Sequence, residues 1–174
     1  MANVTSSMIG VNLNQVTAGT DHSGTGAPYP LGTIVTADNG GQYMMVQAAA
    51  AISTTVKQQY ALAISSAFQA AKITKALAVK GYIIGIAPSQ IIADEGIFWA
   101  CIRGVTSLRV SVSCAADTNL WTTATGGLLD DTSGGSHVVV LGIKITAAAS
   151  ASTSEGNTVR TAIVTNTLVP QLIA

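Results

Sequence analysis

Residues 91–104 read IIADEGIFWACIRG, an acidic turn signal followed by an uninterrupted apolar run. Asp94, Glu95 and Gly96 are residue types that suit a tight reversal of the chain, so we expect a turn there and a strand after it. Successive side chains of a strand point to opposite faces. Both faces of this strand are then apolar, with Phe98, Ala100 and Ile102 on one and Ile97, Trp99 and Cys101 on the other. Such a strand has to be covered twice, by its own core and by another layer such as a second chain.

Three aromatic residues are the predicted packing anchors of the protein. Because Phe98 and Trp99 lie on opposite faces of the strand, we expect one ring to fill the core and the other to lie at a contact with another subunit. Trp121, in the stretch TNLWTTAT, is the third candidate for a core or interface anchor. An exposed tryptophan is also the usual stacking platform for a sugar, which gives Trp99 and Trp121 a second interpretation.

Short apolar runs separated by turn residues flank this strand on both sides. Residues 32–52, GTIVTADNGGQYMMVQAAAAI, contain an Asn39-Gly40 signal between two apolar runs, which predicts a β-hairpin. Residues 107–114 alternate, with Leu108, Val110, Val112 and Cys114 expected on one face, and residues 103–107 are expected to turn the chain before them. In the same way Val139, Leu141, Ile143 and Ile145 are expected to share a face. This spacing predicts an all-β fold, a compact β-sandwich or β-barrel.

The remaining segments give weaker signals. Residues 1–30 lack sustained periodicity, so we expect an extended N-terminal arm that is ordered by contact with a neighbour, followed by a single β-domain at residues 31–174. Residues 57–80 are rich in alanine, and we expect strands at both ends with an irregular or briefly helical middle. The sequence TAAASASTSEGNT predicts a loop, and residues 159–174 a last strand and tail.

The protein carries few charges. Only 9% of its residues are charged, against roughly a quarter in typical soluble domains, and its formal net charge is zero. A charge-poor surface predicts burial against other protein, so we expect a homo-oligomer, a dimer or trimer. No basic block or long apolar stretch is present, which argues against nucleic-acid and membrane partners. The N-terminus has no export signal, so we expect synthesis in the cytoplasm, outside any secretory route.

Candidate residues for chemistry are sparse and scattered. His22 and His137 are the only histidines, and for both a polar loop residue is favoured over a catalytic group. Cys101 and Cys114 are open to pairing, but buried free thiols are favoured without an export signal. The acid pairs Asp94-Glu95 and Asp130-Asp131 lie beside turn formers and, as sequence neighbours, are expected to point to opposite faces. We therefore predict no catalytic residue, no cofactor and no metal ion, and a protein that is not an enzyme.

The order of these segments resembles a known family. The hairpin at 32–52, then IAPSQIIADEGIFWACIRG, then LWTTATGGLLDDTSGG resembles the small decoration, or cement, proteins of tailed-bacteriophage capsids, over roughly residues 32–145. The resemblance implies a compact β-domain that assembles as dimers or trimers on the outer face of the capsid. There it would bind the major capsid protein and bridge neighbouring subunits, with no catalytic residue. Other virion components (a head-fibre base or tail-tube subunit) and a carbohydrate-binding module stay open as alternatives.

Overall fold

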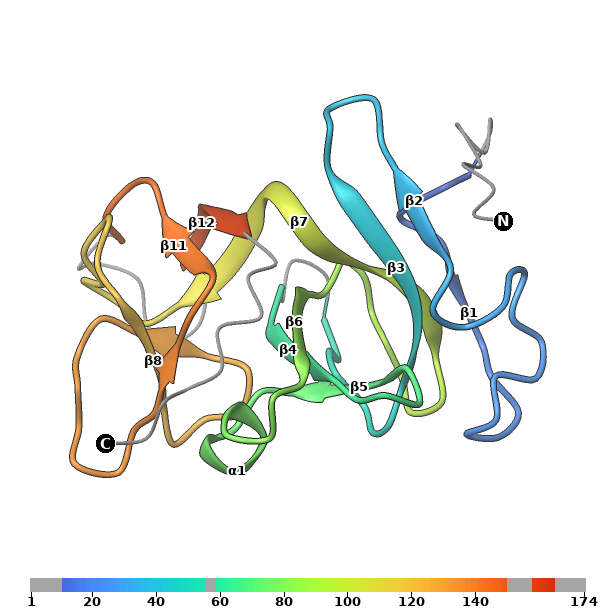
Figure 1. Ribbon diagram of the computed structural model, residues 1–174, viewed down its shortest axis with the longest axis horizontal. Helices are drawn as coiled ribbons and strands as arrows, with labels where there is room; N and C mark the ends of the chain where they lie inside the picture. Colours follow the sequence, from blue (N-terminus) through green and yellow to red (C-terminus); the bar gives the residue numbers. More distant parts are fainter. Residues whose placement is uncertain (1–10, 56–58, 150–157, 165–174) are drawn as a thin grey trace.

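The predicted all-β fold is confirmed, and its centre is a closed five-stranded barrel (Figure 1). The computed structural model describes residues 11–55 and 59–149, and the backbone of residues 158–164. Within these ranges the helical structure amounts to one turn, α1 (Lys75–Ala78). The charge-poor, β-branched-rich sequence therefore forms strands, as its short apolar runs predict.

The barrel is built from β3 (Gln42–Ala48), β4 (Ala61–Ile64), β5 (Gln69–Lys72), β6 (Ile83–Ile86) and β7 (Ile97–Val110). Around the barrel the order is β3, β5, β4, β6 and β7, and the β7–β3 pairing closes the ring. The β3–β5 pair is parallel, whereas the other four are antiparallel. Closure leaves none of the five strands with an entirely unpaired edge.

Two short strands precede the barrel. β1 (Val16–Thr17) pairs with the start of β7, and β2 (Ile34–Thr36) pairs with β3 in the predicted hairpin. The hairpin is confirmed: the chain turns through Gly40, whose φ of +77° is in the region that favours glycine. Through β1, the N-terminal segment becomes part of the sheet. The division into an arm at residues 1–30 and a domain at 31–174 stays a prediction.

The remaining strands form a second, smaller sheet beside the barrel: β8 (Leu120–Thr122), β9 (Leu129–Asp130), β10 (Val139–Val140), β11 (Ile143–Ile145) and β12 (Thr158–Val164). The long strand β7 joins the two parts, because its first half lies in the barrel and its second half pairs with β12 (Figure 1). The expected last strand is thus present as β12, while residues 150–157 and 165–174 lie outside the described ranges.

The expectation that residues 103–107 separate two strands is wrong. β7 continues for 14 residues and changes direction at Gly104, whose φ is +116°. A Cβ at this position would lie 2.8 Å from the Gly41 Cα, so two glycines let the bend pass close to the start of β3. A glycine bend therefore redirects the strand without breaking its pairing.

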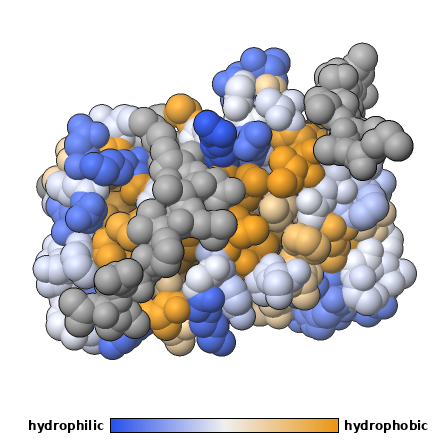
Figure 2. Space-filling view, in the orientation of Figure 1, coloured by the Kyte–Doolittle hydropathy of each residue, from blue (hydrophilic) through white to orange (hydrophobic). Residues whose placement is uncertain are grey.

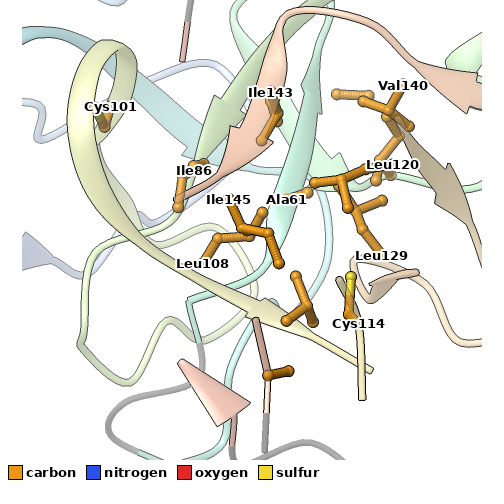
Figure 3. Packing of buried hydrophobic residues seen from close by; sticks show 14 residues of the cluster. Ala61, Ile86, Cys101, Leu108, Cys114, Leu120, Leu129, Val140, Ile143 and Ile145 are labelled. Carbon is orange, nitrogen blue, oxygen red and sulfur yellow. The ribbon is translucent and has the colours of Figure 1, made fainter. Parts of the chain in front are cut away.

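Three apolar clusters form the core: a small one around Trp99 on the outer face of β7, and two large ones. One fills the barrel and contains Phe98, Leu62 and Ile64. The other lies between the barrel and the second sheet, where Leu108 of β7 meets side chains from β8, β9 and β11 (Figure 3). The labelled members of this second cluster are Ala61, Ile86, Cys101, Leu108, Cys114, Leu120, Leu129, Val140, Ile143 and Ile145. Because β7 contributes to both large clusters, it links the packing of the two parts.

The alanine-rich segment differs from its prediction in one respect. β4 and β5 pair as a hairpin whose turn passes through Phe68 at a φ of +59°, and the helical turn α1 follows β5 instead of separating the strands. Ala61, Ala63 and Ala70 are buried in these strands. Ala70 packs inside the barrel, whereas Ala61 and Ala63 pack between the barrel and the second sheet, so burial at both places overrides the helical propensity of alanine. Lys57 and Gln58 lie outside the described residues.

Two predicted strand faces are interrupted by turns. Leu141 is exposed, whereas Ile143 and Ile145 are buried, because the chain turns between β10 and β11 at Gly142, whose φ is +86°. Val112 is likewise exposed after β7 ends. The expectation of one continuous apolar face is wrong at both places, and in each case a turn residue resets the alternation.

Candidate functional site

Phe98 lies inside the barrel. Its side chain is fully buried and packs in the cluster that includes Met44, Val46 and Ile102. Ala100 and Ile102 face the same interior, so the predicted alternation of the strand is confirmed. Phe98 is therefore a core residue and offers no surface to a partner.

Trp99 lies on the outer face of the same strand and is also buried, with 2% of its surface exposed. The layer above Trp99, Met45 and Ile97 comes from the same chain, chiefly from the N-terminal segment. The ring of Tyr29 lies 5.8 Å from that of Trp99 at a tilt of 50°. The expectation that either Phe98 or Trp99 reaches a second subunit is wrong, because the protein covers both faces of the strand itself.

The side chain of Gln47 holds this N-terminal segment against the barrel. Gln47 is fully buried, and its Oε1 accepts hydrogen bonds from the Gly24 N–H at 3.0 Å and from Gln69 Nε2 at 3.1 Å. Its Nε2 donates to the carbonyl oxygens of Asp21 and Glu95. Both the oxygen and the nitrogen of the buried Gln47 amide thus have hydrogen-bond partners. Because these partners include the backbone of residues 21 and 24, the amide favours this one conformation of the N-terminal segment. The sequence had no local signal for this role.

Two pockets adjoin Trp99. One of about 90 Å³ lies beneath the N-terminal segment, between Val11, Tyr29 and Trp99. The other, of about 190 Å³, opens where β6 meets β7 and is lined by Ile86 and Cys101, among others. Ligand pockets typically enclose about 300–1,000 Å³, so neither is large enough to bury a sugar ring and its neighbours.

Trp121 lies in β8 and is partly exposed. Its cross-strand neighbours are Val139 on β10 and Asp130 on β9. Trp99 and Trp121 were the two predicted platforms for stacking on a sugar. Because Trp99 is buried, only Trp121 has an exposed part that could contact a sugar. One partly exposed ring beside a carboxylate has the residue types of a shallow sugar-binding surface.

The turn at Asp94 and Glu95 is confirmed, with Glu95 at a φ of +61°. Asp94 Oδ1 accepts the Glu95 N–H at 3.0 Å. The fold also brings His22 to this turn, where its Nε2 lies 4.0 Å from Asp94 Oδ1 and 3.8 Å from Glu95 Oε1. The sequence separation of these groups hides their proximity. Solvent-exposed ion pairs of this kind contribute little to stability.

Both cysteines are buried free thiols, as the sequence analysis favoured. Burial raises the pKa of Cys101 to about 11. It also raises the pKa of Cys114 to about 12, and the charges of Asp131 and Asp130 reinforce this effect. A thiol is a nucleophile and a metal ligand in its deprotonated form, so neither cysteine is activated at neutral pH.

Cys114, Asp130 and Asp131 form a cluster that sequence reasoning missed. One ligand-type atom from each lies within 4.8 Å of the others. Asp131 Oδ2 accepts the Ala115 N–H, and Asp130 Oδ1 accepts the Asp131 N–H, both at 2.9 Å. The expectation that the two carboxylates point to opposite faces is wrong, because Asp130 ends β9 and its side chain folds back onto the next peptide.

The Asp130 carboxyl is disfavoured in its charged form. Burial raises its pKa, and the side chain of Asp131 adds to the shift, while the backbone hydrogen bond from Asp131 and the charge of His137 oppose it. His137 itself precedes β10 and packs against Gly134, in keeping with a structural role. The hydrogen bonds that these carboxylates accept from backbone N–H groups hold the loop after β9, so the cluster serves local chain geometry.

Replacing both Asp130 and Asp131 with Asn is expected to leave the melting temperature at pH 7 unchanged or raised. The amide oxygens can accept the same backbone hydrogen bonds, and the charge repulsion disappears. A carboxyl whose pKa is raised by folding stabilises the protein most below its ordinary value of 3.8 and loses this contribution as the pH rises. The difference between the variant and the parent protein should therefore shrink on acidification, as thermal melts between pH 3 and 7 would show.

A stabilisation of the parent protein by Ca²⁺ or Zn²⁺ that vanishes in this double variant would contradict the structural interpretation. It would make the cluster an ion site, since carboxylate oxygens and thiolates are the ligands that these cations prefer.

Apolar side chains are exposed around the molecule, and Figure 2 shows apolar residues across the middle of one face. The large exposed ones in the described ranges are Ile34, Val79, Ile91, Val105, Val112 and Leu141. Ile34 lies in β2 and Val105 in β7, and the other four lie in connections between elements. Apolar side chains therefore take up part of the surface that charged residues would occupy in a typical soluble domain.

A scan against protein-family models gives no match, and searches among curated proteins and solved structures give none either. No helix within the described residues is long and apolar enough to span a membrane.

Proposed function

We propose that the protein is a virion structural component, a decoration or cement protein on the exterior of a bacteriophage capsid. It would bind the major capsid protein, associate with itself as a dimer or trimer, and stabilise the lattice by bridging neighbouring subunits. No catalytic step is part of this proposal. It rests on the resemblance in segment order and on one physical observation, the charge-poor surface of a rigid β-structure.

The surface supports this proposal as follows. A protein that works alone in solution usually keeps its surface hydrated with charged residues, which here make up 9% of the chain. Val105, on the bend of β7, is 57% exposed, and Ile91 is 52% exposed. Burial of scattered apolar side chains against a lattice would offset the cost of exposing them to water. A closed barrel would lose little conformational entropy on binding, because its backbone is already fixed.

A cement protein would work through many modest contacts. Each copy that binds only the assembled shell stabilises that state by mass action, and a copy that spans two subunits gains from the second contact being intramolecular. Opening the shell then requires breaking these contacts together.

The first test is the oligomeric state and shell binding of the purified protein. Light scattering at micromolar concentration is expected to give a dimer or trimer, and sedimentation with capsid shells of the virus that encodes it should give saturable binding. Because the exposed contacts are mainly apolar, occupancy should change less than about twofold between 50 and 500 mM NaCl. A monomer that stays in the supernatant would contradict the proposal.

A carbohydrate-binding module is the second candidate, and the partial exposure of Trp121 beside Asp130 favours it. A glycan screen with the Trp121→Ala variant as control separates the two functions. Sugar binding that depends on Trp121, together with no shell binding, would replace the cement proposal. A head-fibre base or tail-tube subunit would instead be located by antibody labelling of virions at one vertex or along the tail.

A further inference from the structure

Two positively charged side chains share one buried tyrosine ring. Lys72 Nζ lies 4.4 Å from the centroid of the Tyr60 ring, and Arg109 Cζ lies 4.9 Å from the same centroid. Arg109 Nη1 also donates a hydrogen bond to the Tyr60 hydroxyl. Each cation is attracted by the ring, but the two like charges repel each other.

Nothing in the described ranges balances these charges. Neither Lys72 nor Arg109 has a carboxylate within 4.0 Å there, since the ion pairs found in those ranges both involve His22. Arg109 Nε is buried and has no acceptor among the described groups. Burial lowers the pKa of Lys72, and the nearby Arg109 lowers it further, in agreement with an uncompensated pair.

The backbone around the pair is held firmly. The Arg109 N–H donates to the Gln59 carbonyl at 2.9 Å, and the Ala61 N–H donates to the Gly127 carbonyl at 3.0 Å. Gly127 has a φ of +79°, and a Cβ there would lie 2.8 Å from the Tyr60 Cβ. The loop before β9 is therefore packed against Tyr60, so the ring that both cations contact is held in place before any ligand arrives.

We propose that Lys72 and Arg109 form a binding site for a small oxyanion, a carboxylate or phosphate group, at the junction of β4, β5 and β7. An oxyanion between them would replace the repulsion with two charge-assisted contacts and use donors of the Arg109 guanidinium that Tyr60 leaves free. This inference does not depend on the proposed role in a capsid, because it concerns the charge balance of the fold itself.

The test compares thermal melts and calorimetric titrations in phosphate, acetate and chloride at constant ionic strength and pH 7. For the parent protein, tens of millimolar phosphate or acetate should raise the melting temperature by about 2–4 °C over chloride. Lys72→Met, which keeps an apolar stem against Tyr60, should weaken anion binding at least about tenfold. Whichever of the two anions binds more tightly identifies the ligand chemistry.

Lys80→Met is the matched control, because Lys80 Nζ also lies near one ring, 5.9 Å from the Tyr82 centroid, but no second cation interacts with that ring in the described ranges. This variant should keep the full anion response. No response beyond chloride in the parent protein, or an equal loss in both variants, would overturn the proposal.

A third variant tests whether a carboxylate of the chain itself occupies the site. Glu155 is the one acidic residue outside the described ranges. If Glu155→Gln responds to phosphate or acetate while the parent protein does not, the site is filled from within and the proposal of an external ligand fails. Equal responses of the parent protein and Glu155→Gln support an external ligand.

Discussion

Replacing Phe98 with Ala is expected to lower the free energy of unfolding by about 3–5 kcal/mol. The ring is fully buried in the barrel, where Leu62 and Ile64 of β4 belong to the same cluster. Removing it takes away apolar contacts and leaves a cavity that the surrounding closed strands cannot fill by moving together. Equilibrium unfolding in urea, monitored by tryptophan fluorescence, measures the loss as a lower midpoint.

Two variants control this prediction. Phe98→Leu keeps much of the volume and should cost less than Phe98→Ala. Trp121→Ala removes a larger ring from a partly exposed position in β8, so it should also cost less than Phe98→Ala despite the larger truncation. If Phe98→Ala unfolds at the same midpoint as the parent protein, the closed barrel cannot be the stable core described above.

The alternation of residues 97–102 correctly predicted the two faces of the central strand, because strand geometry has a period of two residues whatever the surroundings. The Asn39-Gly40 hairpin was predictable for the same local reason. What covers the outer face was not predictable, since the residues above Trp99 come from a segment with no periodicity of its own. The sequence predicted that the outer face of the strand is covered. Only the fold shows that residues from Val11 onward cover it.

The candidate clusters were beyond sequence reasoning because their members are distant in the chain. Tyr60 and Arg109 are 49 residues apart, and Ala115 and Asp131 are 16 apart. Neither spacing matches a motif, and each contact depends on which strands become neighbours. The bend at Gly104 is a further example, because a glycine inside an apolar run is compatible with both a turn and a continuous bent strand.

Trp99→Ala is expected to cost about 3–5 kcal/mol and, unlike Phe98→Ala, to loosen the N-terminal segment selectively. Trp99 is the largest of the residues that this segment covers. Its ring contacts the ring of Tyr29, which belongs to the segment. Limited proteolysis should cleave residues 11–31 of this variant faster than those of the parent protein under conditions where the barrel stays folded. Mass spectrometry of the early fragments locates the cuts.

Tyr29→Ala tests the same contact from the other side. It removes the ring pair but leaves Trp99 in place, so it should loosen the segment with a smaller loss of overall stability, since such pairs contribute about 0.5–1.5 kcal/mol beyond burial. If both variants protect residues 11–31 as well as the parent protein does, the apolar contact is not what holds the segment. The hydrogen bonds of Gln47 to Gly24, Asp21 and Glu95 would then be the principal attachment, and Gln47→Leu, which cannot make them, should release it.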